Sequence, residues 1–115
     1  MAVEHLSDAD YERKLGESEM AVVDFYAAWC GNCVIFSRRF VELAADYPHI
    51  RFFVCDGGRA PALRDSVDIE DVPYFGLYRN GRLVGGFSTS DVTAFRQRIE
   101  ERFGPAPDEA EAAGS

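Results

Sequence analysis

Short apolar runs alternate with segments of helical periodicity along this chain, and that alternation restricts the possible folds more than any other feature. Residues 21–26 (AVVDFY) and 50–55 (IRFFVC) are rich in β-branched and aromatic residues, which predicts two buried strands. Between them, apolar residues recur at helical spacing until Pro48 ends the pattern. An alternation of strands and helices is typical of a sheet that is covered by helices.

A hairpin is predicted near the C-terminal end of the alternation. Residues 74–79 and 82–87 flank Asn80-Gly81, the dipeptide that best tolerates the positive φ angles of a type I′ turn. Helices are predicted over residues 7–15, 34–47 and 61–66, and from a cap at Ser88 or Ser90 to residue 103. One broad buried face is expected on the second helix, formed by Val34, Ile35, Phe36, Phe40, Val41, Leu43, Ala44 and Tyr47. The order βαβαβαββα implies an α/β fold with a central mixed sheet of four or five strands and helices on both faces.

The composition fits one domain with a short tail. The chain has 115 residues, of which 47% are hydrophobic and nine are Phe, so it can bury a core without a metal or a disulfide staple. Residues 104–115 (GPAPDEAEAAGS) contain no large apolar residue. We therefore expect a domain over residues 1–103 and a disordered acidic C-terminal tail over residues 104–115.

The charge of the chain excludes several classes of partner. The formal net charge is −8, and an acidic surface disfavours binding to nucleic acid or to anionic membranes. The acidic N-terminal segment does not resemble a signal peptide, and no apolar stretch approaches the roughly 20 residues that span a bilayer. We therefore expect a cytoplasmic, monomeric protein that binds neither nucleic acid nor membrane.

Two of the three cysteines, Cys30 and Cys33, lie at the predicted junction of a strand and a helix. An odd number of cysteines fits poorly with a disulfide framework, so this spacing indicates catalysis or metal binding. A helix N-terminus presents unpaired N–H groups and a partial positive charge, which stabilise a thiolate at Cys30. Only the thiolate attacks a disulfide, so Cys30 is the expected nucleophile and the more buried Cys33 is the expected resolving thiol.

Asp24 is the single charged residue inside an apolar strand, and it is the candidate acceptor for the proton of Cys33. Burial is expected to raise the pKa of this carboxyl group. A structural zinc site is the alternative for the cysteine pair, but the other possible ligands, Cys55, His5 and His49, lack paired spacing, so no metal is expected. We expect Cys55 to be buried and inert in a strand, and both histidines to lie on surface turns.

Residues 23–33 (VDFYAAWCGNC) closely resemble the active-site segment of the thioredoxin family. The resemblance extends in element order over residues 5–103, and Val72-Pro73 and the Asn80-Gly81 hairpin are similar to further family motifs. It implies the thioredoxin fold and the activity of a protein dithiol–disulfide oxidoreductase. It also implies a redox-active disulfide between the two cysteines in place of a bound cofactor.

The resemblance also assigns roles to individual residues. Cys30 and Cys33 match the redox pair of the family, Asp24 matches its buried acid, and Trp29 matches its active-site indole. Pro73 matches a proline that is cis in the family, and the backbone before it is free to pair with an extended substrate strand. The substrate-binding residues implied in this way are Trp29, Gly31, Asn32, Val72, Pro73 and Thr89. The chain differs from most thioredoxins at Asn32, where proline is common, and at Val54, where a lysine is usual.

The function expected from these residues is the reduction of protein disulfides. The resemblance implies a thioredoxin-reductase-type partner, which is flavin-dependent and restores the dithiol. Two alternatives remain open at this point. The chain could be a thiol oxidant or isomerase with a more oxidising site, because the polar Asn32 resembles isomerase sites, or it could be a non-catalytic interaction module with the thioredoxin fold.

Overall fold

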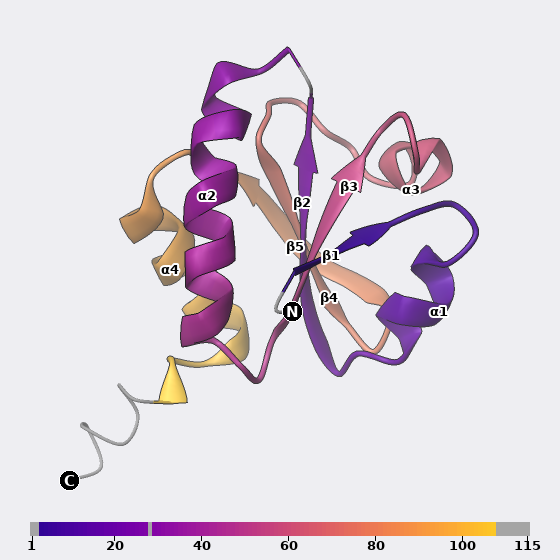
Figure 1. Cartoon of the computed structure of the whole chain (residues 1–115). Coiled ribbons are helices and arrows are strands. Elements are labelled where there is room, and N and C mark those ends of the chain that lie inside the picture. The colour runs from indigo at the N-terminus through magenta and orange to yellow at the C-terminus, as the bar shows by residue number, and fades with distance from the viewer. Residues whose placement is uncertain (1–2, 28, 108–115) are drawn as a thin grey trace, which may run out of the picture.

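The computed structural model describes residues 3–27 and 29–107, and a five-stranded mixed sheet lies at its centre (Figure 1). The strands are β1 (Val3–Leu6), β2 (Met20–Tyr26), β3 (Arg51–Asp56), β4 (Tyr74–Arg79) and β5 (Arg82–Ser88). They lie side by side in the order β1-β3-β2-β4-β5. The first three are mutually parallel, whereas β4 is antiparallel to β2 and to β5. The predicted order βαβαβαββα and the mixed sheet are therefore confirmed, although no residue range had been predicted for the first strand, β1.

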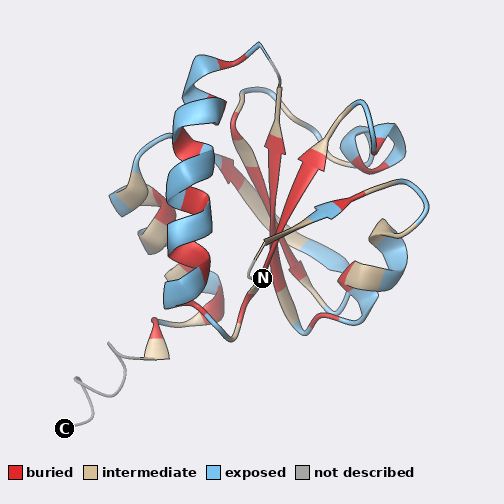
Figure 2. Cartoon of the chain, viewed as in Figure 1, coloured by how far each residue is buried: buried red, intermediate tan, exposed pale blue. Residues whose placement is uncertain are grey.

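Helices cover both faces of this sheet (Figure 1). They are α1 (Tyr11–Gly16), α2 (Gly31–Asp46), α3 (Pro61–Asp65) and α4 (Val92–Phe103). α2 and α4 pack on one face, where Phe36, Phe40 and Phe95 join the larger buried cluster. α1 and α3 cover the other face through Leu15 and Leu63. The sheet is consequently buried on both faces along β2 and β3, as the red strands in Figure 2 show.

Aromatic packing holds α2 and α4 to the sheet. The ring centroid of Phe75 on β4 lies 4.9 Å from that of Phe95 and 5.1 Å from that of Phe36. All three side chains are at most 1% exposed. Full burial of each contributes about 1.5–3 kcal/mol, so this contact between the helices and the strand is a main source of stability.

The buried face of α2 is narrower than the sequence predicts. Phe36, Phe40, Leu43, Ala44 and Tyr47 are buried as expected. In contrast, Val34, Ile35 and Val41 are 57%, 69% and 47% exposed, so their assignment to the core is wrong. Apolar residues lie around more than half of the circumference of this helix, but only one side of it faces the sheet.

Two helix starts also differ from their predicted positions. α4 is capped by Asp91, whose Oδ2 accepts a hydrogen bond from the Ala94 amide at 3.0 Å, and not by Ser88 or Ser90. The first helix is preceded by a turn at Ser7, whose amide donates to Asp10 Oδ1 at 2.8 Å, and its helical part begins only at Tyr11. The predicted hairpin turn is confirmed, since Asn80 has φ 52° and Gly81 has φ 86°.

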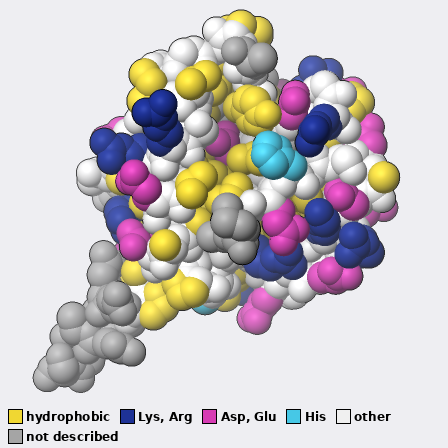
Figure 3. Space-filling view, in the orientation of Figure 1, with side chains coloured by type: hydrophobic (Ala, Val, Ile, Leu, Met, Phe, Trp, Pro, Cys, Tyr) yellow, Lys and Arg dark blue, Asp and Glu magenta, His cyan; other side chains and the backbone are white. Residues whose placement is uncertain are grey.

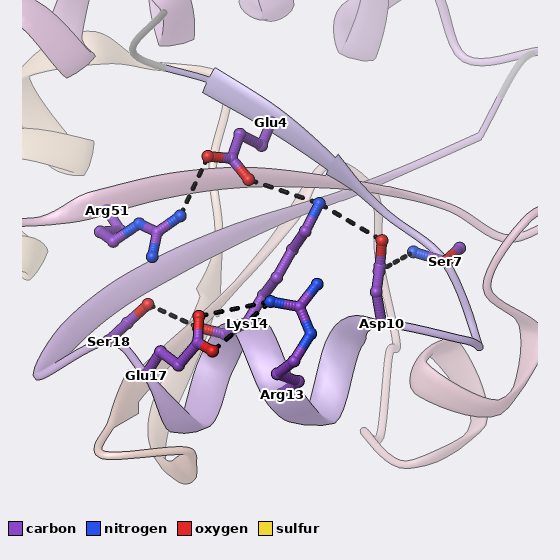
Figure 4. A network of polar contacts seen from close by, with 8 residues as sticks. All are labelled: Glu4, Ser7, Asp10, Arg13, Lys14, Glu17, Ser18 and Arg51. Atoms are coloured by element: carbon purple, nitrogen blue, oxygen red, sulfur yellow. Dashed lines mark hydrogen bonds and ion pairs between the residues drawn. The ribbon is translucent and has the colours of Figure 1, made fainter.

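Ion pairs connect the edge strand β1 to its neighbours (Figure 4). Glu4 Oε2 lies 3.4 Å from Lys14 Nζ on α1, and Glu4 Oε1 lies 3.0 Å from Arg51 Nη2 on β3. Lys14 also pairs with Asp10 at 3.3 Å. Each pair is partly exposed and contributes no more than about 1 kcal/mol. Together they fix the orientation of β1, in which His5 follows Glu4.

The C-terminal residues divide into two parts. Residues 108–115 of the predicted tail lie outside the described residues. Of the preceding residues, Ala106 is 5% exposed and belongs to the larger buried cluster, so the packed chain continues beyond residue 103. Within the described part of the chain, none of the helices has the length and apolar composition that crossing a membrane requires.

Candidate active site

Cys30 lies where β2 leads into α2. The chain turns after Tyr26, with the Cys30 amide donating to the Ala27 carbonyl at 3.0 Å, and Cys30 then becomes the N-cap of α2. Its Sγ accepts a hydrogen bond from the Cys33 amide at 3.1 Å. This sulfur therefore takes the place that a hydroxyl or carboxylate oxygen has in an ordinary N-cap. A thiolate accepts such a bond more strongly than a thiol does, and the helix dipole acts in the same direction.

The sheet topology brings a second loop to this cysteine. β4 is antiparallel to β2 and pairs Tyr74 with Phe25, so the residues before β4 lie beside the end of β2. The peptide bond between Val72 and Pro73 is cis, as the resemblance implies. The Cys30 sulfur lies 4.0 Å from the Val72 carbonyl oxygen. The predicted nucleophile and the predicted cis-proline loop are thus neighbours, although they are far apart in the sequence.

The two cysteines of the pair have different environments. Cys30 is 8% exposed and Cys33 is 1% exposed, so the predicted order of burial is confirmed. Both are free thiols. Burial, with a smaller effect of the hydrogen bond to Cys30, raises the pKa of Cys33 to about 12. Cys33 consequently remains a protonated thiol at neutral pH and must transfer its proton when it reacts.

Asp24 lies on β2 beneath α2 and is almost completely buried. It is 1% exposed, and neither of its carboxylate oxygens has a hydrogen-bond partner among the described residues. Burial raises the pKa of this carboxyl group from its usual 3.8 to about 7. Among residues 3–27 and 29–107, no charged group opposes that shift. Unpaired buried carboxylates are costly, so Asp24 is poised to take up a proton near neutral pH.

A cavity of about 410 Å³ connects Asp24 with Cys33. Its walls are mainly apolar and come from α2, β1 and β3, including Val34, Val41 and Val54. Figure 3 shows hydrophobic side chains gathered along α2 and between α2 and the sheet. The predicted proton donor and the predicted proton acceptor therefore line the same cavity.

Trp29, the residue before Cys30, borders a different groove. Its side chain is 82% exposed, so it is not a core residue. The groove has a volume of about 760 Å³ and is also lined by Tyr26, Ile69 and Val72. An exposed indole beside a groove and a nucleophilic sulfur is a suitable contact surface for a protein substrate.

The other predicted binding residues lie near Cys30 to different degrees. Gly31 is exposed in the first turn of α2. Asn32 is exposed and borders a separate cavity between α2 and α4, and its amide makes no hydrogen bond to Cys30 within residues 29–107. Thr89 follows β5, whose last residue pairs with Tyr74, so it lies at the same end of the sheet as Pro73. Its hydroxyl accepts a hydrogen bond from the Asp91 amide at 3.1 Å.

One residue of this region was assigned wrongly from the sequence. His5 lies in β1, not on a surface turn, and it lines the cavity of Asp24 and Cys33. Its pairing with Val54 places it on the face of the sheet that α2 covers, and a strand this short and polar gives no local signal of that pairing. Cys55, in contrast, is buried in β3 as predicted, and its thiol lies 3.8 Å from the Ala60 carbonyl oxygen.

Comparison with known families decides the classification. The thioredoxin family model matches residues 2–101, which is most of the chain. The chain belongs to the thioredoxin family. Among curated relatives, thioredoxin of Gallus gallus is 30% identical over 100 residues, which cover 87% of this chain and 91% of the relative. Mitochondrial thioredoxin-3 of Saccharomyces cerevisiae is 28% identical over 92 residues, which cover 80% of this chain and 72% of the relative.

Solved thioredoxin structures share the fold. Plasmodium falciparum thioredoxin superposes with a TM-score of 0.80 at 26% identity, over 86% of this chain and 98% of that one. A cysteine-to-serine mutant of Entamoeba histolytica thioredoxin gives a TM-score of 0.76 at 32% identity, over 87% of this chain and 99% of that one. The thioredoxin fold is thereby confirmed, and membership of this family supports the general class of thiol–disulfide oxidoreductases.

Proposed function

We propose that this thioredoxin-family protein reduces protein disulfides through Cys30 and Cys33. The observation that carries the proposal is the arrangement around Cys33. The backbone amide of Cys33 donates a hydrogen bond to the Cys30 sulfur, and its buried thiol shares a cavity with the Asp24 carboxylate, which has no partner among the described residues. A nucleophile, a resolving thiol and a proton acceptor are the three groups that two-step disulfide exchange requires.

In the first step, the thiolate of Cys30 attacks one sulfur of the substrate disulfide. The substrate S–S bond breaks, a mixed disulfide forms, and the other substrate sulfur leaves as a thiolate that takes a proton from solvent. The exposed indole of Trp29 and the Val72 backbone are the surfaces that would hold the substrate here. An extended substrate segment would pair with the backbone at Val72 as an added strand.

In the second step, Cys33 attacks the Cys30 sulfur of the mixed disulfide. Its proton passes to Asp24, and the second substrate sulfur leaves as a thiolate. Two electrons have then moved from the protein to the substrate, and the protein holds a Cys30–Cys33 disulfide. We propose that a thioredoxin-reductase-type partner returns the two electrons, that no bound cofactor takes part, and that the protein works as a monomer in the cytoplasm.

Insulin reduction by dithiothreitol tests the proposal. The wild-type protein should accelerate the precipitation of insulin chains, and Cys30→Ser should lower the rate to that of dithiothreitol alone, because serine cannot form the mixed disulfide. A wild-type protein without effect would exclude the proposed activity and favour an interaction module.

A redox titration against glutathione separates a reductant from an oxidant. The disulfides of reducing thioredoxins have potentials of about −270 mV, and those of isomerases have potentials of about −180 mV. We expect a value closer to the first. A value near the second would replace the proposed reductant with an isomerase-like protein.

A further inference from the structure

The cavity that joins Asp24 and Cys33 also contains an imidazole. We propose that His5 is a proton-exchange residue for this pair and passes the proton that Asp24 accepts from Cys33 on to solvent. This inference rests on the disulfide reduction proposed above. It concerns how the buried carboxyl group is reset after each turnover.

Strand register places His5 and Asp24 in one row across the sheet. His5 on β1 pairs with Val54 on β3, and Val54 pairs with Asp24 on β2. Neighbouring strands are about 4.8 Å apart, so the Cα atoms of His5 and Asp24 are separated by roughly 10 Å. Residues paired in register point to the same face, so both side chains point toward α2. The remaining gap is one that a short chain of water molecules can bridge.

The cavity provides the route between these two groups. Its volume of about 410 Å³ far exceeds the roughly 30 Å³ that one water molecule occupies. Both Asp24 oxygens lack hydrogen-bond partners among the described residues, so they remain available to water. His5 is exposed to solvent, whereas Asp24 is not. The same cavity therefore brings a solvent-exposed imidazole and the buried carboxyl group together.

The other polar groups of the cavity cannot exchange a proton near neutral pH. Arg38 is a permanent cation, and the hydroxyl of Ser37 does not titrate. The pKa of Tyr26 is raised above its usual 10, mainly by burial. Histidine, in contrast, is the side chain that most often serves as a general acid or base in proteins. His5 is thus the one residue lining this cavity, within the described chain, that can relay the proton of Asp24.

The edge strand that carries His5 is held in place. Glu4, the preceding residue, points to the opposite side of β1 and pairs with Lys14 and Arg51 (Figure 4). Leu6, the following residue, is 1% exposed in the smaller buried cluster. These contacts fix the strand orientation, so His5 is directed toward the cavity even though its own side chain is exposed.

Chemical rescue of a His5→Ala variant tests the proposal. Insulin reduction is measured at dithiothreitol concentrations that no longer limit the rate, across pH 6 to 8.5. His5→Ala should lower the rate at pH 7 about tenfold, less than the roughly 10²–10⁴-fold contributed by a direct general acid or base, because His5 acts only through Asp24. Added imidazole at constant ionic strength should restore most of the loss. His49→Gln is the matched control, because His49 lies in the turn after α2, and its rate should neither fall nor respond to imidazole.

A double-mutant cycle links the effect to Asp24. In an Asp24→Asn background, His5→Ala should cause no further loss, because no carboxyl group remains to be reset. The His5 proposal is overturned if His5→Ala keeps the wild-type rate and pH profile. It is equally overturned if the variant is slow but unaffected by imidazole, since that result indicates damaged β1 packing. In both cases an active wild-type protein leaves the proposed disulfide reduction standing, whereas an inactive wild-type protein refutes the disulfide reduction itself.

Discussion

Cys33 and Cys55 are equally buried, yet the structure gives them different chemistry. Both are 1% exposed, and burial is the main cause that raises the pKa of each to about 12. Cys33 lies one helical turn after Cys30 and lines the cavity of Asp24. Cys55 lies in the cluster on the other face of the sheet, beside the aromatic ring of Phe25.

Burial alone therefore does not make a thiol redox-active. A buried thiol reacts when a second sulfur lies within reach and a base accepts its proton. Cys33 has both of these neighbours. Cys55, in contrast, directs its thiol toward the Ala60 carbonyl oxygen. The proposed reaction pairs Cys33 with Cys30 and leaves Cys55 without a partner.

Replacing each of the two buried thiols gives the most direct test. Cys33→Ser should abolish insulin turnover and accumulate a mixed disulfide between Cys30 and the substrate, because the resolving sulfur is missing. Cys55→Ser should keep turnover within about twofold of the wild-type rate, although a buried hydroxyl will cost some stability. Non-reducing gels and mass spectrometry detect the trapped adduct. An inactive but folded Cys55→Ser protein would contradict the contrast.

Alkylation compares all three thiols in one sample. Cys30 should react with iodoacetamide at neutral pH at least about a hundredfold faster than Cys33 or Cys55, because the pKa values of the two buried thiols are raised to about 12. The greater exposure of Cys30, 8% against 1%, acts in the same direction. Peptide mapping after a brief exposure gives the order. Labelling of Cys55 before Cys30 would show that the assigned roles are wrong.

Asp24→Asn separates the effect of the buried carboxylate on stability from its effect on the rate of disulfide reduction. Because burial raises the folded pKa of Asp24 from 3.8 to about 7, the folded state binds more protons than the unfolded state between these two values. Stability of the wild-type protein is therefore lost as pH rises through this window, by about 1.4 kcal/mol per pH unit. Urea unfolding should therefore show that the effect of Asp24→Asn on the free energy of unfolding is about 2 to 3 kcal/mol more stabilising at pH 8 than at pH 5.

The same variant should reduce insulin more slowly, since the proton acceptor of Cys33 is absent. A loss of about tenfold or more is expected at pH 7. Asp56→Asn, at the partly exposed end of β3, is a matched control that should change neither measurement much. A fully active Asp24→Asn protein whose relative stability does not depend on pH would contradict both the burial argument and the proposed role.

The smallest effect is expected at Asn32. Its amide makes no hydrogen bond to the Cys30 sulfur within the described residues, and that sulfur is satisfied by the Cys33 backbone amide. Asn32→Ala should therefore shift the redox potential by less than about 30 mV, the equivalent of one charge-assisted hydrogen bond. A glutathione-coupled titration measures the shift. A larger increase in reducing power would show that the Asn32 side chain does affect the balance between dithiol and disulfide.

Local chemistry allowed much of this molecule to be predicted from its sequence. Asn80-Gly81 specifies its turn through backbone φ angles alone, and the hairpin was predicted to within a residue of its end. Asp24 stands out because a single charge in an apolar strand has few physical explanations. The order of burial of Cys30 and Cys33 follows from their positions in one helical turn. In each case the signal lies within a few residues of the feature.

The errors concern features that depend on distant parts of the chain. Val34, Ile35 and Val41 are apolar, but only the positions of the sheet and α4 decide which side of α2 is covered. His5 occupies a four-residue strand with two polar residues, which has no strand signal until β3 is present to pair with it. The side chain of Ala106 is too small to indicate burial from the sequence, yet this residue packs in the larger buried cluster.

The position of β2 in the centre of the sheet governs when the thiol pair acquires its properties during synthesis. Cys30 and Cys33 leave the ribosome before either strand that flanks β2, because β3 ends at Asp56 and β4 at Arg79. Until both have emerged, Asp24 lacks its strand partners Val54 and Phe75, and the sheet that buries it is incomplete. A nascent chain that stops short of β4 therefore carries the complete CxxC motif without a working redox centre.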